Sequence, residues 1–365
     1  MAETTAIAHH EDYDRANEVK QFDETKKGVK GLIDSGVTSI PRFFVHPPET
    51  LSDLKPNSDS QFVSIPTIDI SGINSGRRKA ILNEVNRAAR HPGFFQIINH
   101  GIPQSTIETT IAATKAFHEQ PPEVKERFYR RDAGTGVSYL SNVDLFQSKA
   151  ASWRDTLQVK MGPTPAPPEA MPEICAKELA EWDKEVVRVG EVLLRLLSEG
   201  LGLGADRLMG MKCLEGRVMV GHYYPFCPEP YRTVGLNSHA DPGVLTVLLQ
   251  DHIGGLQIKS GEVWADVKPV PGALVINIGD LLQIMSNDEY KSVEHRVLAN
   301  PKNEPRVSVA VFLNPSERER MFGPLPELIS SEKQAVYGEF TYSEFMRRFF
   351  TKELDGKSLK NFFRL

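Results

Sequence analysis

The chain of 365 residues is 40% hydrophobic and 25% charged, which is typical of a globular protein with a large core. Its formal net charge of −5, without a basic block, argues against nucleic-acid binding. No stretch approaches the roughly 18 consecutive apolar residues of a membrane-spanning helix, so we expect no membrane partner. The first 20 residues lack the apolar run of a secretory signal, and three cysteines are too few for a disulfide framework. We therefore expect a cytoplasmic enzyme or binding protein.

The first 60 residues predict a tail, a helix and an extended lead-in. Residues 1–15 are polar and predict a disordered tail, and a helix is expected over about Tyr13–Asp34. Four prolines between Pro41 and Ser60 predict an extended connection on the surface. Alternating apolar and polar residues then predict a strand over Val63–Ile70.

Helices dominate the predicted structure of residues 61–210. Apolar residues spaced three and four apart predict helices over Arg77–Arg90, Gln104–Glu119 and Cys175–Leu201. Another helix is expected to start at Pro121-Pro122, and a strand over Gly93–Ile98 lies between the first two helices. We interpret this region as a helical N-terminal half.

The sequence pattern changes at residues 211–320, where short apolar runs alternate with turn-forming residues. The predicted strands are Val218–Tyr224, Val244–Gln250, Gly255–Lys259, Trp264–Val267, Ala273–Ile278, Leu282–Met285, His295–Ala299 and Arg306–Leu313. Eight strands within about 95 residues predict a barrel or a jelly roll. Residues 321–365 form a C-terminal tail with a last helix over Tyr342–Leu354. The expected fold class is therefore α+β.

A candidate metal site begins at His239-Ala240-Asp241. On a strand, His239 and Asp241 would share a face, so that an imidazole and a carboxylate converge. A third ligand is needed, and the nearest candidates are Asp251, His252 and His295. We expect His252 to point outward from a turn, whereas His295 opens a predicted strand. Two histidines and one carboxylate bind one face of a ferrous ion and leave three positions for a bidentate co-substrate and dioxygen.

Arg306 and Ser308 form a second candidate site, because they also share one face of a predicted strand. An arginine in a valine-rich β-strand is costly unless it is paired. A structural ion pair with an aspartate or glutamate is one interpretation. The other is an anion-binding site, since a guanidinium matches a carboxylate in a bidentate manner. After a set of two histidines and an aspartate, we favour the anion-binding site.

Six motifs together resemble the plant 2-oxoglutarate- and Fe(II)-dependent dioxygenases. In chain order they are Gly221–Pro230, His239–Gly243, Gly254–Gln257, Asn277–Asp280, His295–Val297 and Arg306–Ser308. The segment Gly93–Gly101 is also similar to that family, and the resemblance covers about residues 20–365. The His222–Pro225 variant and the lead-in Arg42–Pro48 resemble one specialised-metabolism clade. That clade holds the 1-aminocyclopropane-1-carboxylate oxidase homologues, desacetoxyvindoline 4-hydroxylase and the benzoxazinoid-glucoside dioxygenase.

The resemblance implies a distorted double-stranded β-helix, a jelly-roll core, flanked by helices. The Fe(II) ligands that it implies are His239, Asp241 and His295. It also implies that Arg306 and Ser308, with Tyr224, bind the C5 carboxylate of 2-oxoglutarate. Many members carry Asn where this chain has His222, so the role of His222 is left open.

The activity that the resemblance implies is oxidation of a small plant metabolite, with 2-oxoglutarate converted to succinate and carbon dioxide. Dioxygen is the second co-substrate, and ascorbate is the expected reductant. Hydroxylation is the expected outcome, with desaturation or demethylation as alternatives. We expect a monomer with a small-molecule substrate.

Four aromatic residues are candidates for substrate contacts. Phe312 lies four residues after Ser308 on the same predicted strand face and could stack on an aromatic substrate. Tyr139, Phe146 and Trp153 fall where members of the family place pocket residues. Plain core packing is the alternative for all four side chains.

Two rival functions stay open. An oxidase of the 1-aminocyclopropane-1-carboxylate type shares the iron ligands and the Arg-x-Ser pair but needs no 2-oxo acid. A non-catalytic small-molecule sensor on the same fold would have lost an iron ligand or Arg306, and this chain has lost neither.

Overall fold

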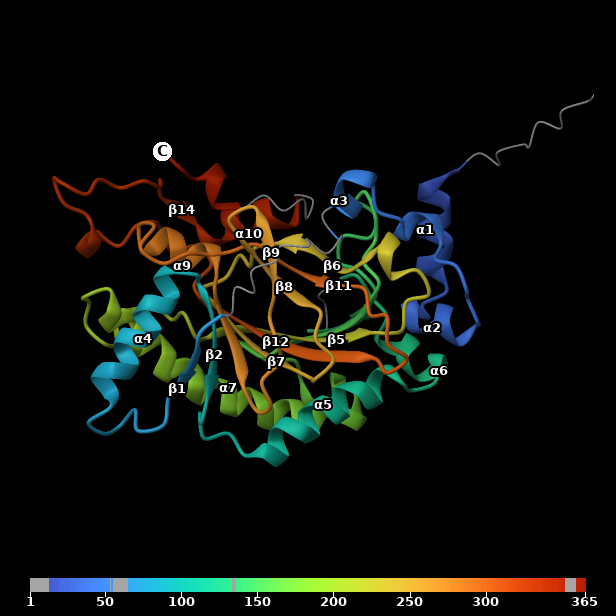
Figure 1. Ribbon diagram of the computed structural model, residues 1–365, viewed down its shortest axis with the longest axis horizontal. Helices are drawn as coiled ribbons and strands as arrows, with labels where there is room; N and C mark the ends of the chain where they lie inside the picture. Colours follow the sequence, from blue (N-terminus) through green and yellow to red (C-terminus); the bar gives the residue numbers. More distant parts are fainter. Residues whose placement is uncertain (1–12, 53, 55–64, 133–135, 352–358) are drawn as a thin grey trace, which may run out of the picture.

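Two β-sheets face each other across the interior of the protein (Figure 1). The computed structural model describes residues 13–52, 54, 65–132, 136–351 and 359–365. The larger sheet has the strand order β1-β2-β10-β7-β12-β5-β4-β3, and the smaller one the order β6-β11-β8-β9. The fold is the predicted α+β jelly roll flanked by helices.

The strands of the larger sheet come from both halves of the chain. They are β1 (Thr67–Asp69), β2 (Phe94–Ile98), β3 (Val137–Leu140), β4 (Asp155–Lys160), β5 (Gly216–Tyr224), β7 (Leu245–Gln250), β10 (Leu274–Ile278) and β12 (Arg306–Asn314). The smaller sheet contains β6 (Val234–His239), β8 (Leu256–Ser260), β9 (Val263–Asp266) and β11 (His295–Leu298). A separate pair joins β13 (Met321–Phe322) to β14 (Phe340–Thr341). Four strands of the larger sheet therefore belong to the region 61–210, which we interpreted as helical.

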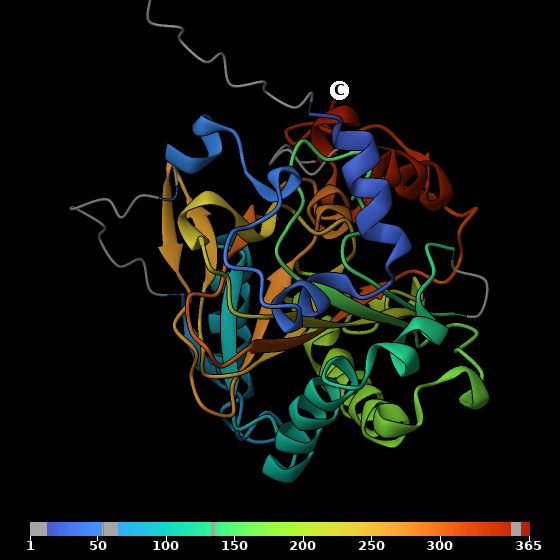
Figure 2. The ribbon, with the colours of Figure 1, turned by 90° about the vertical axis from the view of Figure 1, so that its right-hand side faces the viewer.

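Helices cover the outer face of the larger sheet (Figure 1). Those that pack there are α4 (Arg78–Arg90), α5 (Gln104–His118) and α7 (Glu173–Gly200). At the N-terminus, α1 (Arg15–Glu24) and α2 (Gly28–Asp34) lie beside the jelly roll (Figure 2). The other helices are α3 (Pro48–Ser52), α6 (Pro122–Lys125), α8 (Arg207–Gly210), α9 (Asp280–Met285) and α10 (Tyr342–Phe350). Within the described part of the chain, no helix is long and apolar enough to cross a membrane.

Strand alternation sorts the side chains of β12 between two environments. Val309, Val311 and Leu313 belong to the hydrophobic core shared with the helices. The alternate residues Arg306 and Ser308 line a cavity between the two sheets. Because helices cover one face and the smaller sheet covers the other, almost every residue of β12 is buried. A strand that reads as a nearly continuous apolar run thus carries polar groups only on its inner face.

Several predicted elements differ from the structure. The helix expected over Tyr13–Asp34 is two helices, because Lys26 and Gly28 adopt positive φ angles of 55° and 69°. The lead-in after Pro41 contains a 3₁₀ turn (Arg42–Phe44) and α3, so its described part is not simply extended. Some predictions lie outside the described residues. They concern the tail before residue 13, most of the lead-in after residue 52, the start of the predicted strand at residues 63–64, and the end of the predicted last helix at residues 352–354.

Further differences concern strands. β3 and β4 were not predicted, β6 was expected only as the strand assumed for His239 and Asp241, and the segment expected as a strand over Leu282–Met285 is α9. All six residues of α9 are buried, so its apolar run had no exposed positions to mark a helical period. β6 contains Gly235 and Asn237, residues more typical of turns, and only its tertiary partners make it a strand.

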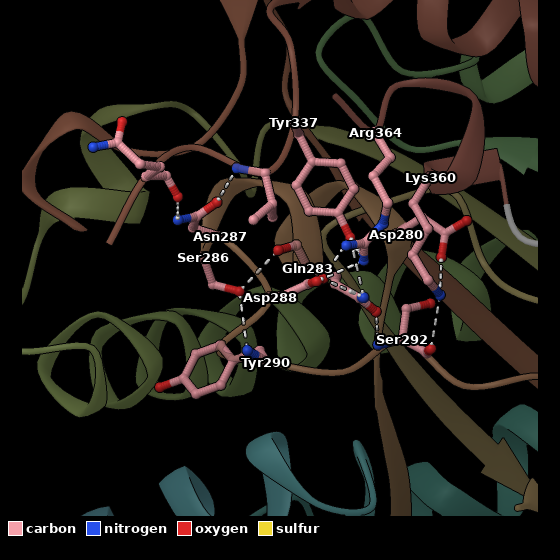
Figure 3. Close-up of polar contacts among 12 residues, drawn as sticks. Asp280, Gln283, Ser286, Asn287, Asp288, Tyr290, Ser292, Tyr337, Lys360 and Arg364 are labelled. Atoms are coloured by element: carbon pink, nitrogen blue, oxygen red, sulfur yellow. Dashed lines mark hydrogen bonds and ion pairs between the residues drawn. The ribbon is translucent and has the colours of Figure 1, made fainter. Parts of the chain in front are cut away.

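The C-terminal tail is anchored on α9 by buried polar contacts (Figure 3). The Asp280 carboxylate accepts a hydrogen bond from the backbone N–H of Leu359 (3.1 Å) and pairs with Lys360 Nζ (3.4 Å). Lys360 Nζ also donates to the backbone carbonyl of Ser292 at 3.1 Å. The tail is thereby tied to the helix that follows β10.

Candidate metal centre and active site

Three potential metal ligands meet where the smaller sheet ends. His239 is the last residue of β6, and His295 is the first residue of β11, directly opposite it in the antiparallel pairing. Asp241 lies two residues after His239 in the loop that follows β6, so the two do not share a strand as predicted. The Nε2 atoms of His239 and His295 lie 3.5 and 3.6 Å from Asp241 Oδ1. Three ligand atoms therefore lie within 4.8 Å of one another.

Hydrogen bonds orient both imidazoles toward this point. His239 Nδ1 lies 2.8 Å from the carbonyl oxygen of Asn237, and His295 Nδ1 lies 3.2 Å from that of Val293. Donation from Nδ1–H leaves the Nε2 lone pairs free to bind a metal ion. Burial and, to a smaller extent, the neighbouring His239 together lower the pKa of His295 to about 4, which keeps the ring neutral as a ligand must be.

The Asp241 carboxylate is held by its other oxygen. Oδ2 accepts hydrogen bonds from Thr246 Oγ1 (2.5 Å) and Asn277 Nδ2 (2.8 Å), so Oδ1 alone faces the two histidines. Burial would raise the pKa of Asp241, but the adjacent His295 and His239 hold it below its usual value. Two imidazoles and one carboxylate with these partners fit the donor set of a ferrous ion. A carboxylate kept ionised is ready to bind it.

The alternative third ligands lie elsewhere. The His252 side chain is exposed, as expected, and its Nε2 lies 3.5 Å from Glu304. The Asp251 carboxylate accepts backbone N–H groups of Ile253 and Val307. Neither side chain lies with His239.

Arg306 lines a cavity of about 50 Å³ that adjoins these ligands. Only 2% of the residue is exposed. Its Nη1 donates to Ser308 Oγ at 3.2 Å and its Nη2 to Gln250 Oε1 at 3.0 Å, while Nε has no hydrogen-bond partner. Among the residues that the structure describes, no carboxylate forms an ion pair with it, which removes the structural ion pair as an explanation. The site fits the carboxylate of a small acid.

Tyr224 lies opposite Arg306 in the pairing of β5 with β12. The Arg306 guanidinium lies 4.8 Å from the centre of the Tyr224 ring, a cation–π contact that helps orient it. Ser308 faces His222 and Gln250 on the two neighbouring strands. The register therefore gathers Arg306, Ser308 and Tyr224 on one wall of the cavity.

His222 stands between this cavity and a larger one. Its Nδ1 lies 3.0 Å from Thr156 Oγ1, and the residue lines both cavities. Burial, together with the cationic Arg154 and Arg306, lowers the pKa of His222 well below its ordinary value. The side chain is therefore a neutral hydrogen-bonding group beside the candidate metal site.

The larger cavity has a volume of about 260 Å³ and also reaches the candidate metal ligands His239 and Asp241. The residues common to both cavities are His222, Leu236, His239, Asp241 and Phe312. Phe312, a predicted substrate contact, thus lies at the junction. The side chains of α10 that close the larger cavity are Met346, Phe349 and Phe350.

The other three predicted contacts do not line either cavity. Tyr139 is buried on the helix side of the larger sheet, where its ring packs against Phe117. Trp153 is buried against Phe44 near the N-terminal helices. Phe146 is 51% exposed, with the Arg131 guanidinium over its ring. Strand alternation and loop packing, which sequence position does not reveal, direct these side chains away.

Several site residues were missed by sequence reasoning. Asn277 lay within a recognised motif, but only the register of β10 with β7 shows that it lies beside Thr246 and reaches Asp241. Gln250 likewise reaches Arg306 through the pairing of β7 with β12. Arg154 enters the larger cavity from the residue before β4, a strand that was not predicted.

Family models match both halves of the chain. Residues 215–315 match the 2OG-Fe(II) oxygenase superfamily, and residues 65–180 match the N-terminal region described as non-haem dioxygenase in morphine synthesis. The first match contains all three candidate metal ligands and Arg306.

Similar proteins extend along nearly the whole chain. It is 49% identical over 349 residues to 1-aminocyclopropane-1-carboxylate oxidase homolog 1 of Arabidopsis thaliana, covering 94% of this chain and 95% of that one. Homolog 3 of the same plant is 47% identical and covers 95% and 96% of the two chains. A crystal structure of JOX2 in complex with 2OG, Fe and JA has a TM-score of 0.82 at 30% identity, covering 93% of this chain and 97% of that one. The chain belongs to the 2OG-Fe(II) oxygenase superfamily, among the plant homologues of 1-aminocyclopropane-1-carboxylate oxidase, and is an Fe(II)- and 2-oxoglutarate-dependent dioxygenase.

Proposed function

We propose that this dioxygenase hydroxylates a small specialised plant metabolite and releases succinate and carbon dioxide. The observation that carries the proposal is the convergence of three ligand atoms beside a buried arginine that lacks a carboxylate partner. The metal and the 2-oxo acid, when bound, supply the oxidising chemistry, and the protein supplies binding and orientation.

In this proposal His239, Asp241 and His295 bind Fe(II). The backbone carbonyls that accept from Nδ1 of each histidine fix the ring orientations. Because Thr246 and Asn277 occupy Asp241 Oδ2, Oδ1 is the oxygen that would bind the ion. The three residues would hold the ion where the two cavities meet, since His239 and Asp241 line both of them.

Arg306, Ser308 and Tyr224 bind the far carboxylate of 2-oxoglutarate. The cavity of about 50 Å³ joins Arg306 to the candidate metal ligands, which suits a small diacid that reaches from one to the other. Gln250 holds one end of the guanidinium, so the charge is oriented before the acid binds.

In this proposal the substrate occupies the cavity of about 260 Å³, whose lining includes Phe312. Apolar side chains from β5, β12 and α10 form part of its wall and exclude water when a substrate is bound. Hydroxylation is the outcome we propose. Resemblance of the lead-in and of the His222–Pro225 segment to the specialised-metabolism clade supports the choice of substrate class.

We further propose that the protein acts as a monomer in the cytoplasm. Its three cysteines are buried and unpaired, and burial raises the pKa of Cys175 and Cys213 to about 12. Thiols in this state suit a reducing compartment. Light scattering and localisation of a tagged protein test the two statements.

The test is a reaction of the purified protein with Fe(II), ascorbate, 2-oxoglutarate and an extract of plant metabolites, followed by mass spectrometry. We expect succinate and a product heavier by one oxygen atom, both absent from His239→Ala. A control, His252→Ala, removes an exposed histidine and should leave both products unchanged. Turnover that persists without 2-oxoglutarate would instead favour an oxidase of the 1-aminocyclopropane-1-carboxylate type.

A further inference from the structure

A second buried arginine, Arg154, lines the larger cavity without a carboxylate partner. The residue is only 5% exposed. Its Nη1 makes a long contact of 3.5 Å with Asn142 Oδ1, an oxygen that already accepts the Ser152 N–H at 2.9 Å. Its Nε is buried and has no hydrogen-bond partner. Across the described residues, no carboxylate oxygen forms an ion pair with the Arg154 guanidinium.

The contrast with Arg217, on β5, shows how this protein satisfies a structural arginine. Arg217 Nε and Nη2 donate to the two oxygens of Asp183 at 2.8 and 3.0 Å. Its remaining N–H groups donate to the backbone carbonyls of Leu214 and Met161. Burying a guanidinium without such partners costs free energy. We therefore expect the unsatisfied Arg154 to bind an anion that is not part of the chain.

The backbone on both sides of Arg154 is held firmly. Trp153 Nε1 donates to the carbonyl of Phe226 at 3.0 Å, and its backbone N–H donates to Val234 at 2.8 Å. The Asp155 carboxylate accepts the backbone N–H groups of residues 29 and 30 at 2.7 and 2.8 Å. Burial lowers the pKa of Arg154, an effect that the carboxylates of Asp144 and Asp155 oppose. The backbone that carries Arg154 is thus held in place at the cavity wall.

The two unsatisfied arginines lie in different cavities. Arg306 lines the smaller one and Arg154 the larger one, and the candidate metal ligands His239 and Asp241 line both. One arginine receives the far carboxylate of the co-substrate, which leaves the other for the molecule that is oxidised. We propose that Arg154 binds a carboxylate of the substrate, which is therefore an organic acid; this inference rests on the proposed function.

The other residues that line the cavity indicate the chemistry of the rest of such an acid. Its apolar wall includes Val218, Val220 and Phe312. Asp144 also lines the cavity, and its Oδ2 is buried without a hydrogen-bond partner. An acid with an apolar body and one hydrogen-bond donor, such as a hydroxyl, would satisfy both the cation and Asp144.

The test compares acids with their uncharged amides. The protein is loaded with Mn(II) in place of Fe(II) and saturated with 2-oxoglutarate, so that the Arg306 site is occupied. Binding of 3-phenylpropionate, cinnamate and 4-phenylbutyrate, and of the three matching carboxamides, is measured by calorimetry. We expect at least one acid to bind about tenfold or more tightly than its amide, because a charge-assisted bidentate contact replaces a neutral one.

Variants assign that preference to one residue. Arg154→Gln should remove the preference for the acid, and Arg154→Lys should restore part of it. Arg195→Gln, a control that removes an exposed arginine of α7, should keep the full preference. The affinity for 2-oxoglutarate should stay within twofold of the original in every variant.

Equal affinities, or no binding, for all three acid–amide pairs would overturn the inference, as would a preference that survives in Arg154→Gln. If Arg154→Gln does not fold, the comparison of acids with amides on the unaltered protein and on Arg154→Lys decides. Failure of 2-oxoglutarate itself to bind the Mn(II) protein would contradict the proposed function instead, and the two failures are therefore distinguishable.

Discussion

His295 lies directly opposite His239 in the pairing of β11 with β6, and their ring centroids are 4.3 Å apart. Because the strands are antiparallel, the end of β6 meets the start of β11, and residues 56 positions apart become neighbours. The loop after β6 then brings Asp241 to the same point. The site is therefore built from strand ends held by a rigid sheet, which accounts for its geometry and suggests how it can be weakened.

Removing the hydroxyl that holds Asp241 should weaken metal binding without unfolding the protein. Thr246→Val leaves Asp241 Oδ2 with Asn277 as its remaining side-chain donor. We expect the affinity for Fe(II) or Mn(II) to fall roughly 10- to 100-fold, the range usual for lost hydrogen bonds to metal ligands. The control is Thr233→Val, because the buried Thr233 hydroxyl has no hydrogen-bond partner. Equal metal affinities in the two variants, measured by titration, would contradict this role of Thr246.

Gln250 should affect the binding of 2-oxoglutarate but not the binding of the metal ion. Gln250→Met removes the acceptor of Arg306 Nη2 and frees the guanidinium to change orientation. We expect the KM for 2-oxoglutarate to rise about fivefold to tenfold, the loss of roughly one hydrogen bond to a charged group. Gln257→Met is the matched control, since Gln257 holds Arg296 on the smaller sheet. An unchanged KM in Gln250→Met would show that Arg306 needs no such support.

Gly279, directly before α9, packs against the loop that carries Asp241. A Cβ at this position would lie 2.1 Å from the backbone oxygen of Gly243 and 3.2 Å from that of Asp241. Gly279→Ala should therefore displace the ligand loop and lower metal affinity at least tenfold, with a lower melting temperature. Gly210→Ala meets no atom within 4 Å and should change neither quantity.

The sequence predicted the fold class because the evidence was local and repeated. Short apolar runs separated by turn residues mark the strands, and β12 and β7 appear almost at their observed bounds. β4 was missed because it begins at the buried Asp155, whose carboxylate is satisfied by distant backbone N–H groups and by Ser141. Elements that depend on tertiary partners leave little signal in their own residues.

Some residues of the candidate site could likewise be predicted from local motifs, and others could not. His239, Asp241, His295 and Arg306 stand in short motifs whose residue types point to metal and carboxylate binding. Arg154 stands in no such motif. Its role as an anion-binding residue is indicated only by the lack of a carboxylate partner, and the residues around it come from distant parts of the chain. Tyr139 illustrates the opposite case, since its strand directs it to the helical side of the sheet.

The C-terminal anchor should contribute to global stability. Lys360→Met removes the ion pair with Asp280, a carboxylate with no exposed surface, and the bond to the Ser292 carbonyl. We expect a loss of about 2 kcal/mol in the free energy of unfolding, as for a mostly buried pair that loses one partner. Lys333→Met breaks the more exposed pair with Glu289 and should cost less than about 1 kcal/mol. Denaturant titration of the two variants distinguishes them.

Acid should destabilise the protein through buried histidines such as His118. Burial, reinforced by the nearby Lys125, lowers the pKa of His118 to about 3, and its Nε2 donates to the carbonyl of Gly221 at 3.1 Å. Between pH 6.5 and pH 3 the unfolded chain binds a proton that the folded protein does not, so stability falls as the pH falls through this window.

A substitution isolates that contribution. His118→Phe should reduce the slope of unfolding free energy against pH, between pH 6 and pH 4, by about 1.4 kcal/mol per pH unit. His252→Phe, at an exposed position, should leave the slope as it is. An unchanged slope in His118→Phe would mean that other groups carry the acid sensitivity.

The central claim is that the three ligands and Arg306 support oxidation coupled to 2-oxoglutarate. The most direct measurement is mass spectrometry of succinate formed under ¹⁸O-labelled dioxygen, with Fe(II), ascorbate and 2-oxoglutarate. We predict succinate with one labelled oxygen atom from the unaltered protein and none from Asp241→Ala. Unlabelled succinate, or labelled succinate that survives in Asp241→Ala, would contradict the account.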